Sequence, residues 1–455
     1  MALSATSANR LRAAALACAL ALGASEASAT PELVVDVDTG QTLFERDATA
    51  PWFPASLTKL MTAYVALHAV RDGRLTLDTP LTMSARAANT PASKMGFRPG
   101  VEVTLDNALK MLMVKSPNDV AVMVAESISG SVEAFADEMN ATARCLGLKE
   151  SHFVNPNGLH DPTHVSSARD MAMIGRALLR DFPEHSDLYG IGALRLGDEI
   201  ILNHNGLLGR YPGADGMKTG FTCPAGFNVV ASATQGARRL IVVVLGFPSA
   251  RDRTIEAAHL FDRGFAQWGG GEGQLESLPA SSALSAPDMR PDICSRRNRA
   301  AIAAAEEEEA APPPGGLFGR NTIFAAITGS KAPMTAEMAE QPVHFDPVPI
   351  FIGPKPGWTG PVLAARPVEK APAGGTPSVA SAYAADKPSA VEGAPPESAP
   401  IALQSAVRPM KPAKAAATAK TAVHAKAAAT AKTAVHAKLA AAKKKDRHTL
   451  AAPAR

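Results

Sequence analysis

The chain has 455 residues, of which 46% are hydrophobic and 5% aromatic, and its formal net charge is +3. A chain of this length can form one large domain or two ordinary ones, and because no internal apolar run approaches ~18 residues, a polytopic membrane protein is excluded. The charge is divided unevenly, since residues 411–455 carry +10 and the other 410 residues carry −7. A basic tail on a mildly acidic body argues against nucleic acid as a partner, and four cysteines are too few for a disulfide-based scaffold.

The first 29 residues have the three regions of a secretory signal peptide. Arg10 and Arg12 end a segment without acidic residues, an apolar run follows over residues 13–23, and the small residues at 27–29 form a cleavage site after Ala29. The alternative is a short buried core helix, which does not explain the order of the three regions. We therefore expect export to the periplasm or cell envelope.

Residues 30–270 have the apolar patterns of an α+β domain. Alternating apolar residues and turn residues predict hairpins at the two ends of this range, and a 3.6-residue period predicts helices between them. The expected strands are 33–37, 41–46, 227–234 and 239–247, and the expected helices are 56–70, 105–114, 119–127, 168–179 and 254–268. Strands at both ends with helices between them favour α+β over alternating βαβ units.

After residue 270 the composition becomes rich in Pro, Ala, Ser and Gly. Residues 271–410 have too few apolar side chains to offset the entropy of ordering, which predicts a disordered linker. Residues 411–455 form a Lys/Ala-rich tail, in which the twelve-residue sequence 413–424 is repeated at 425–436. The repeat has no apolar stripe and cannot bury itself as a solenoid unit would.

The first chemical motif is Ser56-Leu57-Thr58-Lys59, at the start of the helix expected over 56–70. Serine and lysine at i and i+3 lie on the same side of a helix. A lysine whose pKa is lowered by burial and nearby positive charge can take the proton of a serine nucleophile. The alternative is an exposed lysine on an ordinary helix, but this helix is apolar nearly all round, so the charge of Lys59 needs a reason.

The second motif is Ser116-Pro117-Asn118, between two expected helices. Taken locally, its simplest interpretation is a helix start, with Ser116 as N-cap, Pro117 at N1 and Asp119 at N3. The same loop can direct Ser116 and Asn118 into a cleft, where a hydroxyl relays a proton and an amide holds a substrate carbonyl.

The third motif is Lys218-Thr219-Gly220, followed by Phe221 and the apolar strands. Lys218 and Thr219 can bind a carboxylate by charge and hydrogen bonding, and Gly220 lets a substrate backbone approach. An edge strand at this point can accept an extended peptide. The alternative is a surface turn.

The three motifs, in this order and with starts at residues 56, 116 and 218, resemble those of the serine D-alanyl-D-alanine carboxypeptidases, the low-molecular-mass penicillin-binding proteins. The resemblance covers about residues 30–268 and extends to residues 153–159, 166–170 and 203–208. It implies a β-lactamase/transpeptidase-like domain, with an antiparallel sheet flanked by helices and a helical subdomain. A second β-rich domain and a C-terminal amphipathic helix, which family members often carry, are not evident after residue 268.

The resemblance also implies a role for each motif residue. The implied catalytic residues are Ser56 as acylated nucleophile, Lys59 as general base and Ser116 as proton shuttle. The implied substrate-binding residues are Asn118 for the amide, Lys218 and Thr219 for the terminal carboxylate, Gly220 on the substrate-binding strand, and Phe221, whose backbone N–H joins that of Ser56 in an oxyanion hole. The implied partners are peptidoglycan stem peptides and β-lactams, with no metal and no organic cofactor.

Two other functions stay open at this stage. A serine β-lactamase shares the motifs but needs a carboxylate to activate the deacylating water, and Glu150, the nearest acid before Asn155, has an unsuitable spacing. A non-catalytic wall-binding protein would depend on the basic tail, whose charge allows contact with anionic wall polymer or lipid headgroups, although a solvated linker is the simpler interpretation.

Histidines and cysteines give weaker signals. His160 and His164 have an i, i+4 spacing that suits zinc, but Pro162 interrupts the helix that would align them, so no metal site is expected. Cys223, three residues past Gly220, is close enough in sequence to lie near the cleft, but a small buried side chain is the favoured interpretation. With Cys145 and Cys294 it leaves an odd number of thiols after export, so at least one stays unpaired or pairs between chains.

Overall fold

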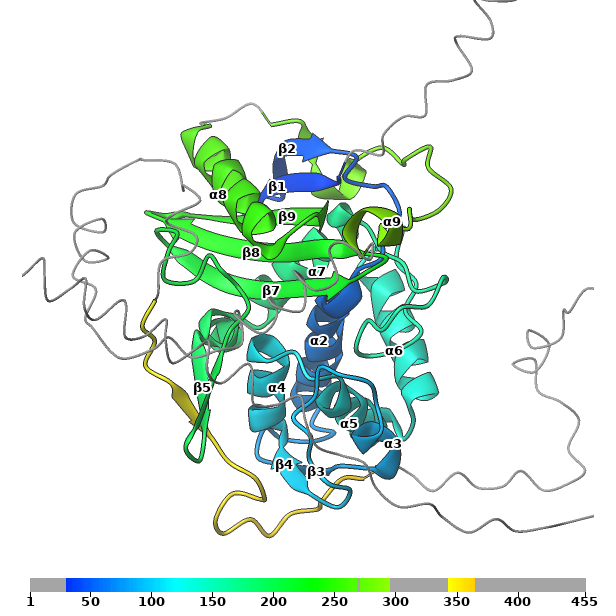
Figure 1. The fold of residues 1–455 in the computed structure, drawn as a ribbon, viewed down its shortest axis with the longest axis vertical. Helices are drawn as coiled ribbons and strands as arrows, with labels where there is room; N and C mark the ends of the chain where they lie inside the picture. The colour runs from blue at the N-terminus through cyan, green and yellow to red at the C-terminus, as the bar shows by residue number, and fades with distance from the viewer. Residues whose placement is uncertain (1–29, 268–270, 295–342, 365–455) are drawn as a thin grey trace, which may run out of the picture. The chain divides into compact units, whose positions relative to one another are not determined.

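The structure is a computed structural model that describes residues 30–267, 271–294 and 343–364 (Figure 1). The predicted signal peptide and the basic repeat tail lie outside these ranges. Among the described helices, none combines the length and apolar character that crossing a membrane requires.

A six-stranded antiparallel sheet forms the upper part of the domain in Figure 1. Its strand order is β10-β2-β1-β9-β8-β7, so the first strand pairs with one more than 200 residues later, with Val34 opposite Val242. Both predicted hairpins are confirmed. The bounds are β1 Glu32–Asp36, β2 Gln41–Arg46, β7 Ala214–Thr222, β8 Gly226–Gln235, β9 Arg238–Phe247 and β10 Gly273–Gln274.

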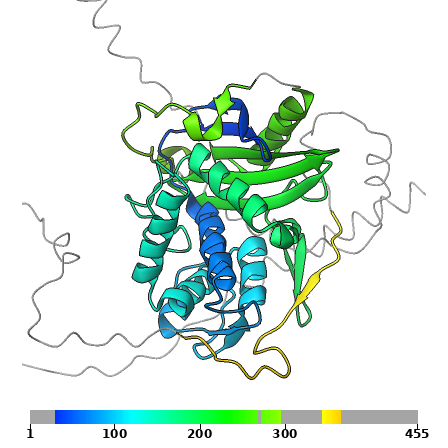
Figure 2. The same cartoon turned by 180° about the vertical axis from the view of Figure 1, so that it is seen from behind.

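Helices cover both faces of this sheet, as Figures 1 and 2 show. Helix α8 (Ala250–Ala266) packs on one face through Phe261, which contacts the apolar cluster that includes Val242. Helix α7 (Ala168–Asp181) packs on the other face, where Val243 belongs to the main core. Adjacent strand residues therefore enter different cores, as the two-residue period of a strand requires.

A helical subdomain lies below the sheet around α2 (Thr58–Arg71). Helix α2 is buried nearly all round, as its composition predicts, and a 3-10 turn, η1 (Ala55–Leu57), precedes it. The surrounding elements are α3 Ala85–Ala88, α4 Leu105–Val114, α5 Asn118–Ser129, α6 Val132–Cys145, β3 Pro80–Thr82 and β4 Glu102–Thr104. Sequence patterns did not identify α6, although Ser131 caps it and Phe135 and Met139 lie on its buried face.

The prediction of a disordered linker is wrong for residues 271–294. This segment forms β10, η3 (Leu275–Ser277) and α9 (Arg290–Ile293), and Leu275 is fully buried. A disulfide joins Cys294 to Cys223, so the expectation of a simple buried thiol at Cys223 is also wrong. The composition of the segment is poor in apolar residues, and its order comes from a covalent bond and from pairing with a distant strand.

Residues 343–364 are also ordered, as a strap along the lower edge of the domain (yellow in Figure 1). Strand β11 (Val348–Ile350) pairs in parallel with β5 (Ala193–Leu196), which pairs with β6 (Glu199–Leu202) and follows η2 (Pro183–Gly190). Farther along, Gly353 N–H donates to Glu102 O, and Leu363 N–H donates to Pro80 O. Backbone hydrogen bonds to open strand edges hold the strap. Because these bonds do not depend on the type of side chain, the amino-acid composition does not predict them.

A buried charged cluster joins α7 to the loop before it. The guanidinium of Arg169, fully buried, donates to the Asp170 carboxylate and lies 2.9 Å from a Glu150 oxygen. The Asp170 carboxylate also accepts the Glu150 backbone N–H and the Ser151 hydroxyl. Burial and then the Asp170 carboxylate raise the pKa of Glu150 to about 7, and the Arg169 guanidinium only partly opposes this.

This cluster makes stability depend on pH. Because the folded-state pKa of Glu150 lies above its ordinary value of 4.5, the folded chain holds an extra proton between these values. The stability contributed by the protonated carboxyl is present below about pH 4.5 and is lost as the pH rises through about 7. Glu150→Gln changes the free energy of unfolding relative to wild type. We expect this change to be about 1–3 kcal/mol more stabilising at pH 8 than at pH 5. Urea unfolding at the two pH values measures this difference.

The exposed Glu199→Gln is the matched control, for which no pH-dependent change is expected. Equal effects of Glu150→Gln at pH 5 and pH 8 would contradict a raised pKa at this position.

Candidate active site

Ser56 and Lys59 meet at the junction of η1 and α2. Lys59 is 0% exposed, and its Nζ lies 2.9 Å from the Ser56 Oγ. Because Ser56 stands in the 3-10 turn and Lys59 in the first turn of α2, the i, i+3 spacing brings the amine to the hydroxyl. The interpretation of Lys59 as an exposed helix residue is wrong.

The Lys59 amine is held by two further acceptors. Its Nζ donates to Asn118 Oδ1 and to Asn157 O, both at 2.8 Å. Burial lowers the pKa of Lys59 well below its ordinary value, the Lys218 ammonium lowers this pKa further, and Asp119 opposes both. A neutral amine is therefore accessible, and its lone pair can accept the Ser56 proton across the 2.9 Å contact.

The loop before Ser56 is fixed by neighbours from two distant segments. Ala55 has a left-handed φ of 48°, and a Cβ on Gly158 would stand 1.8 Å from Ala55 O, so only glycine fits there. Asn228, fully buried in β8, donates to Phe53 O at 3.0 Å and to Pro54 O at 3.4 Å. Sequence reasoning missed Asn228, although an amide inside the apolar run 227–234 was a usable signal.

Ser116 and Asn118 lie on opposite sides of Pro117. Ser116 has a φ of 62°, and Pro117, with extended backbone, is the N-cap residue of α5. The prediction of Ser116 as N-cap is wrong, because an N-cap residue normally has β-region backbone and no side chain caps this helix. The Ser116 Oγ is buried without a hydrogen-bond partner among the described residues.

The Asn118 amide is oriented by the loop opposite it. Its Nδ2 donates to Pro91 O at 3.2 Å and to Ala92 O at 3.0 Å, while its Oδ1 accepts from Lys59. Asn118 therefore connects the loop before residue 93 to the buried amine.

Strand β7 is the edge strand of the main sheet, as expected for Lys218-Thr219-Gly220. Lys218 is 2% exposed and Thr219 is 7% exposed, and Lys218 Nζ donates to Thr219 O at 2.8 Å. A Cβ on Gly220 would stand 3.0 Å from the backbone nitrogens of Ser56 and Leu57, so glycine lets η1 pack against the strand. This contact brings the Ser56 N–H close to the strand that carries Phe221.

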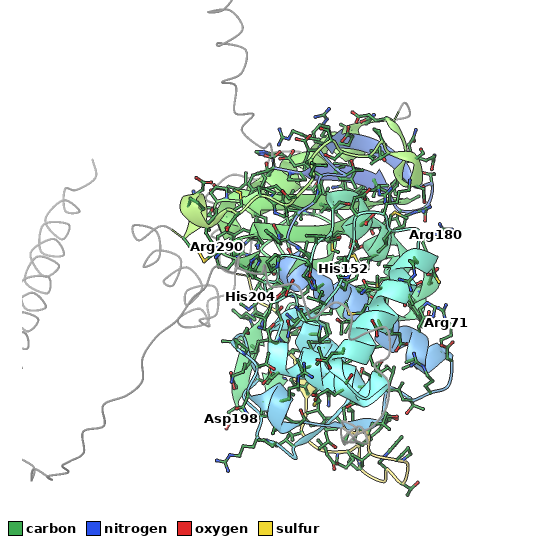
Figure 3. The ribbon with its side chains drawn as sticks, turned by 90° about the vertical axis from the view of Figure 1, so that its right-hand side faces the viewer. Arg71, His152, Arg180, Asp198, His204 and Arg290 are labelled. Carbon is green, nitrogen blue, oxygen red and sulfur yellow. A yellow bond between two sulfur atoms is a disulfide. The ribbon has the colours of Figure 1, made fainter. Side chains whose placement is uncertain are left out.

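His204 is a residue that sequence reasoning did not single out. Burial, and then the positive charges of Lys218, Lys115 and Arg253, lower the pKa of His204 to about 4. His204 is therefore neutral at pH 7, close to the Lys218 ammonium on β7. Figure 3 shows it on the side of the molecule that also carries Arg290.

His164 and Glu150 have roles in the fold. His164 Nε2 lies 2.8 Å from Thr58 Oγ1, its Nδ1 accepts the Val154 N–H, and burial lowers its pKa to about 3. Glu150 accepts from Ser167 and pairs with Arg169. Within residues 30–267, 271–294 and 343–364, no group of three His, Cys, Asp or Glu side chains is arranged to hold a metal ion.

Comparison with known proteins places this geometry in context. A family model described as D-alanyl-D-alanine carboxypeptidase matches residues 19–249. D-alanyl-D-alanine carboxypeptidase DacA of Haemophilus influenzae is 39% identical over 241 residues, which cover 52% of this chain and 61% of that protein. DacB2 of Mycobacterium tuberculosis is 35% identical over 248 residues, which cover 51% of this chain and 81% of that protein.

Solved structures give the same result. Penicillin binding protein 5 from Haemophilus influenzae is 38% identical with a TM-score of 0.50, covering 52% of this chain and 70% of that one. D-alanyl-D-alanine carboxypeptidase DacD from Francisella tularensis is 32% identical with a TM-score of 0.50, over the same shares. The match spans about three fifths of the length of DacA.

The charge of Lys218 should control the pKa of Lys59. Because the Lys218 ammonium disfavours a second positive charge, we expect Lys218→Met to raise the pKa of Lys59 toward its ordinary value. The measurement is a titration of the lysine ¹³Cε signals by NMR, with Lys59 assigned by substitution. Lys149→Met, at an exposed site, is the control and should leave this pKa where it is. An unchanged or lowered pKa in Lys218→Met would contradict the electrostatic coupling.

Proposed function

The chain belongs to the D-alanyl-D-alanine carboxypeptidase family, and we propose that it removes the terminal D-alanine from peptidoglycan stem peptides as a serine peptidase. One observation supports this activity above all. The buried Lys59 amine, with a lowered pKa, lies 2.9 Å from the Ser56 hydroxyl and faces an edge strand that carries Lys218. A base, a nucleophile and a cation for a carboxylate thus meet at one edge of the sheet.

Substrate binding in this proposal begins with the terminal carboxylate. Lys218 supplies the charge and Thr219 supplies a hydroxyl donor for the carboxylate. The substrate backbone lies along Gly220. The Asn118 side chain hydrogen-bonds the substrate amide and, to do so, gives up its hydrogen bond to Pro91 O or Ala92 O. The scissile carbonyl then points to the backbone N–H groups of Ser56 and Phe221, which stabilise the oxyanion.

Acylation follows from this geometry. Neutral Lys59 takes the proton of Ser56 as the Oγ attacks the carbonyl carbon of the penultimate D-alanine. The Ser116 hydroxyl, buried without a partner among the described residues, relays the proton from the Lys59 ammonium to the nitrogen of the leaving D-alanine, so the C–N bond breaks and Lys59 becomes neutral again. The product is an ester on Ser56. Water, deprotonated by Lys59, attacks this ester, the shortened peptide is released, and the Ser56 oxygen takes the proton back from Lys59.

β-Lactams should acylate the same serine, because their strained amide occupies the position of the scissile bond. The name of the solved Haemophilus influenzae relative, penicillin binding protein 5, supports this proposal. The disulfide between Cys223 and Cys294 supports an oxidising compartment, consistent with export to the periplasm or cell envelope. Contact of the basic tail with anionic wall polymer or membrane stays a proposal from charge alone.

Substitution of Ser56 tests its role as the nucleophile. Ser56→Ala should lower D-alanine release by about 10³-fold or more, because Ser56 supplies the hydroxyl that contacts the Lys59 amine among the described residues. Mass spectrometry after penicillin treatment should find a covalent adduct on the peptide that contains Ser56. The exposed Ser282→Ala is the control and should keep both properties. An adduct on a different residue would overturn the site.

The two substrates of the competing activities separate a carboxypeptidase from a β-lactamase. Glu150, the acid that a β-lactamase would need before Asn155, is engaged by Ser167 and Arg169. We therefore expect D-alanine release from a D-Ala-D-Ala peptide and slow turnover of a chromogenic β-lactam. Fast β-lactam turnover without D-alanine release would favour the β-lactamase. Full activity of Ser56→Ala in cells would favour the non-catalytic wall-binding protein.

A further inference from the structure

The order of the binding groups along β7 gives the direction of the substrate, and this step depends on the proposed function. The terminal carboxylate lies at Lys218 and Thr219, and the scissile carbonyl lies opposite Phe221. The residues upstream of the scissile bond therefore run toward Thr222 and Cys223, at about 3.3 Å per residue. The third residue from the substrate's C-terminus reaches the end of β7.

The segment that contains α9 is fixed at this end of the strand. A disulfide joins Cys223 to Cys294, and Met289 N–H donates to Pro224 O at 3.1 Å. These two constraints enclose Arg290, so its backbone is held beside the point where the upstream part of the substrate leaves β7.

The side chain of Arg290 faces the loop of the nucleophile. Its Nη2 lies 3.5 Å from His160 Nε2, and the His160 ring packs edge-on against Phe53 with centroids 4.7 Å apart. Phe53 precedes Ser56 by three residues. In Figure 3, Arg290 and His204 lie on the same side of the molecule.

Asp288 orients the guanidinium of Arg290 through Nε and leaves other N–H donors of the group available to a ligand. Asp288 accepts from Nε at 3.0 Å, which leaves the Nη2 side directed at His160. This ion pair is exposed, with side-chain exposures of 55% and 48%, and exposed pairs are weak enough to share their cation with a ligand. A guanidinium fork matches the two oxygens of a carboxylate.

We propose that Arg290, supported by His160, is a specificity residue that binds a carboxylate on the substrate residue immediately upstream of the two terminal D-alanines. The substrate class is thus an acyl peptide that ends in X-D-Ala-D-Ala, where X carries a free carboxylate on its side chain. The disulfide is the device that holds this cation at the end of β7.

The test uses two acyl tripeptides, X-D-Ala-D-Ala, in which X is glutamate or the uncharged isostere glutamine. We expect the wild-type kcat/KM for the glutamate peptide to exceed that for the glutamine peptide by about 5–10-fold. Arg290→Ala should bring the two values together, Arg290→Lys should keep part of the preference, and 0.5 M NaCl should reduce it. Hydrolysis of the glutamine peptide shows that each variant is folded.

Arg180→Ala is the matched control, because Arg180 is an exposed arginine on the opposite side in Figure 3. Equal wild-type rates on the two peptides, or a preference that survives Arg290→Ala, would overturn the inference and leave the proposed function standing. Release of D-alanine from neither peptide would overturn the proposed function itself.

A second variant tests the disulfide as the positioning device. Cys223→Ser with Cys294→Ser frees α9 and should reduce the preference for the glutamate peptide at least threefold, with Arg290 still present. A double variant with the full preference would show that the disulfide does not position Arg290.

Discussion

The contact between a buried amine and a serine hydroxyl is the constraint around which this domain is organised. A lysine at 0% exposure loses hydration, and its pKa falls because the charged form is penalised more than the neutral one. Lys218 adds a second positive charge nearby and strengthens the effect. In the proposed mechanism this amine can act as the base because the Ser56 hydroxyl lies 2.9 Å away. Burying the Lys59 amine therefore lowers the stability of the fold, and in the proposed mechanism it makes the Ser56 hydroxyl reactive.

Holding these groups together requires the sheet and the helical subdomain to approach closely. Two glycines permit the approach, since a Cβ on Gly220 or Gly158 would collide with the backbone around Ser56. Asn228 reinforces it by donating from the sheet to the carbonyls just before the nucleophile. None of these three side chains reacts in the proposed chemistry. They determine the distance at which that chemistry can occur.

Segments beyond the expected domain boundary complete the surface of the domain. The disulfide to Cys294 covers one end of β7, and the strap of residues 343–364 extends the sheet at β5. Both segments attach to strand edges or strand ends, where backbone groups lack partners. A segment poor in apolar residues can be ordered in this way, because a covalent bond and backbone pairing add to the burial of a few apolar side chains, such as Leu275 and Ile350.

The motifs, the α+β class, both hairpins and most helices could be predicted from the sequence, because periodicity and motif spacing are local or one-dimensional properties. It also indicated that Lys59 lies in a buried helix. Tertiary structure alone decided that Ser116 has left-handed backbone and does not cap α5, that Asn228 supports the nucleophile loop, and that Cys223 pairs with Cys294. The Asn228 hydrogen bonds and the disulfide join residues 70 or more positions apart. A pattern along the chain does not encode which distant groups will meet, and the sheet and helices decide it when they pack.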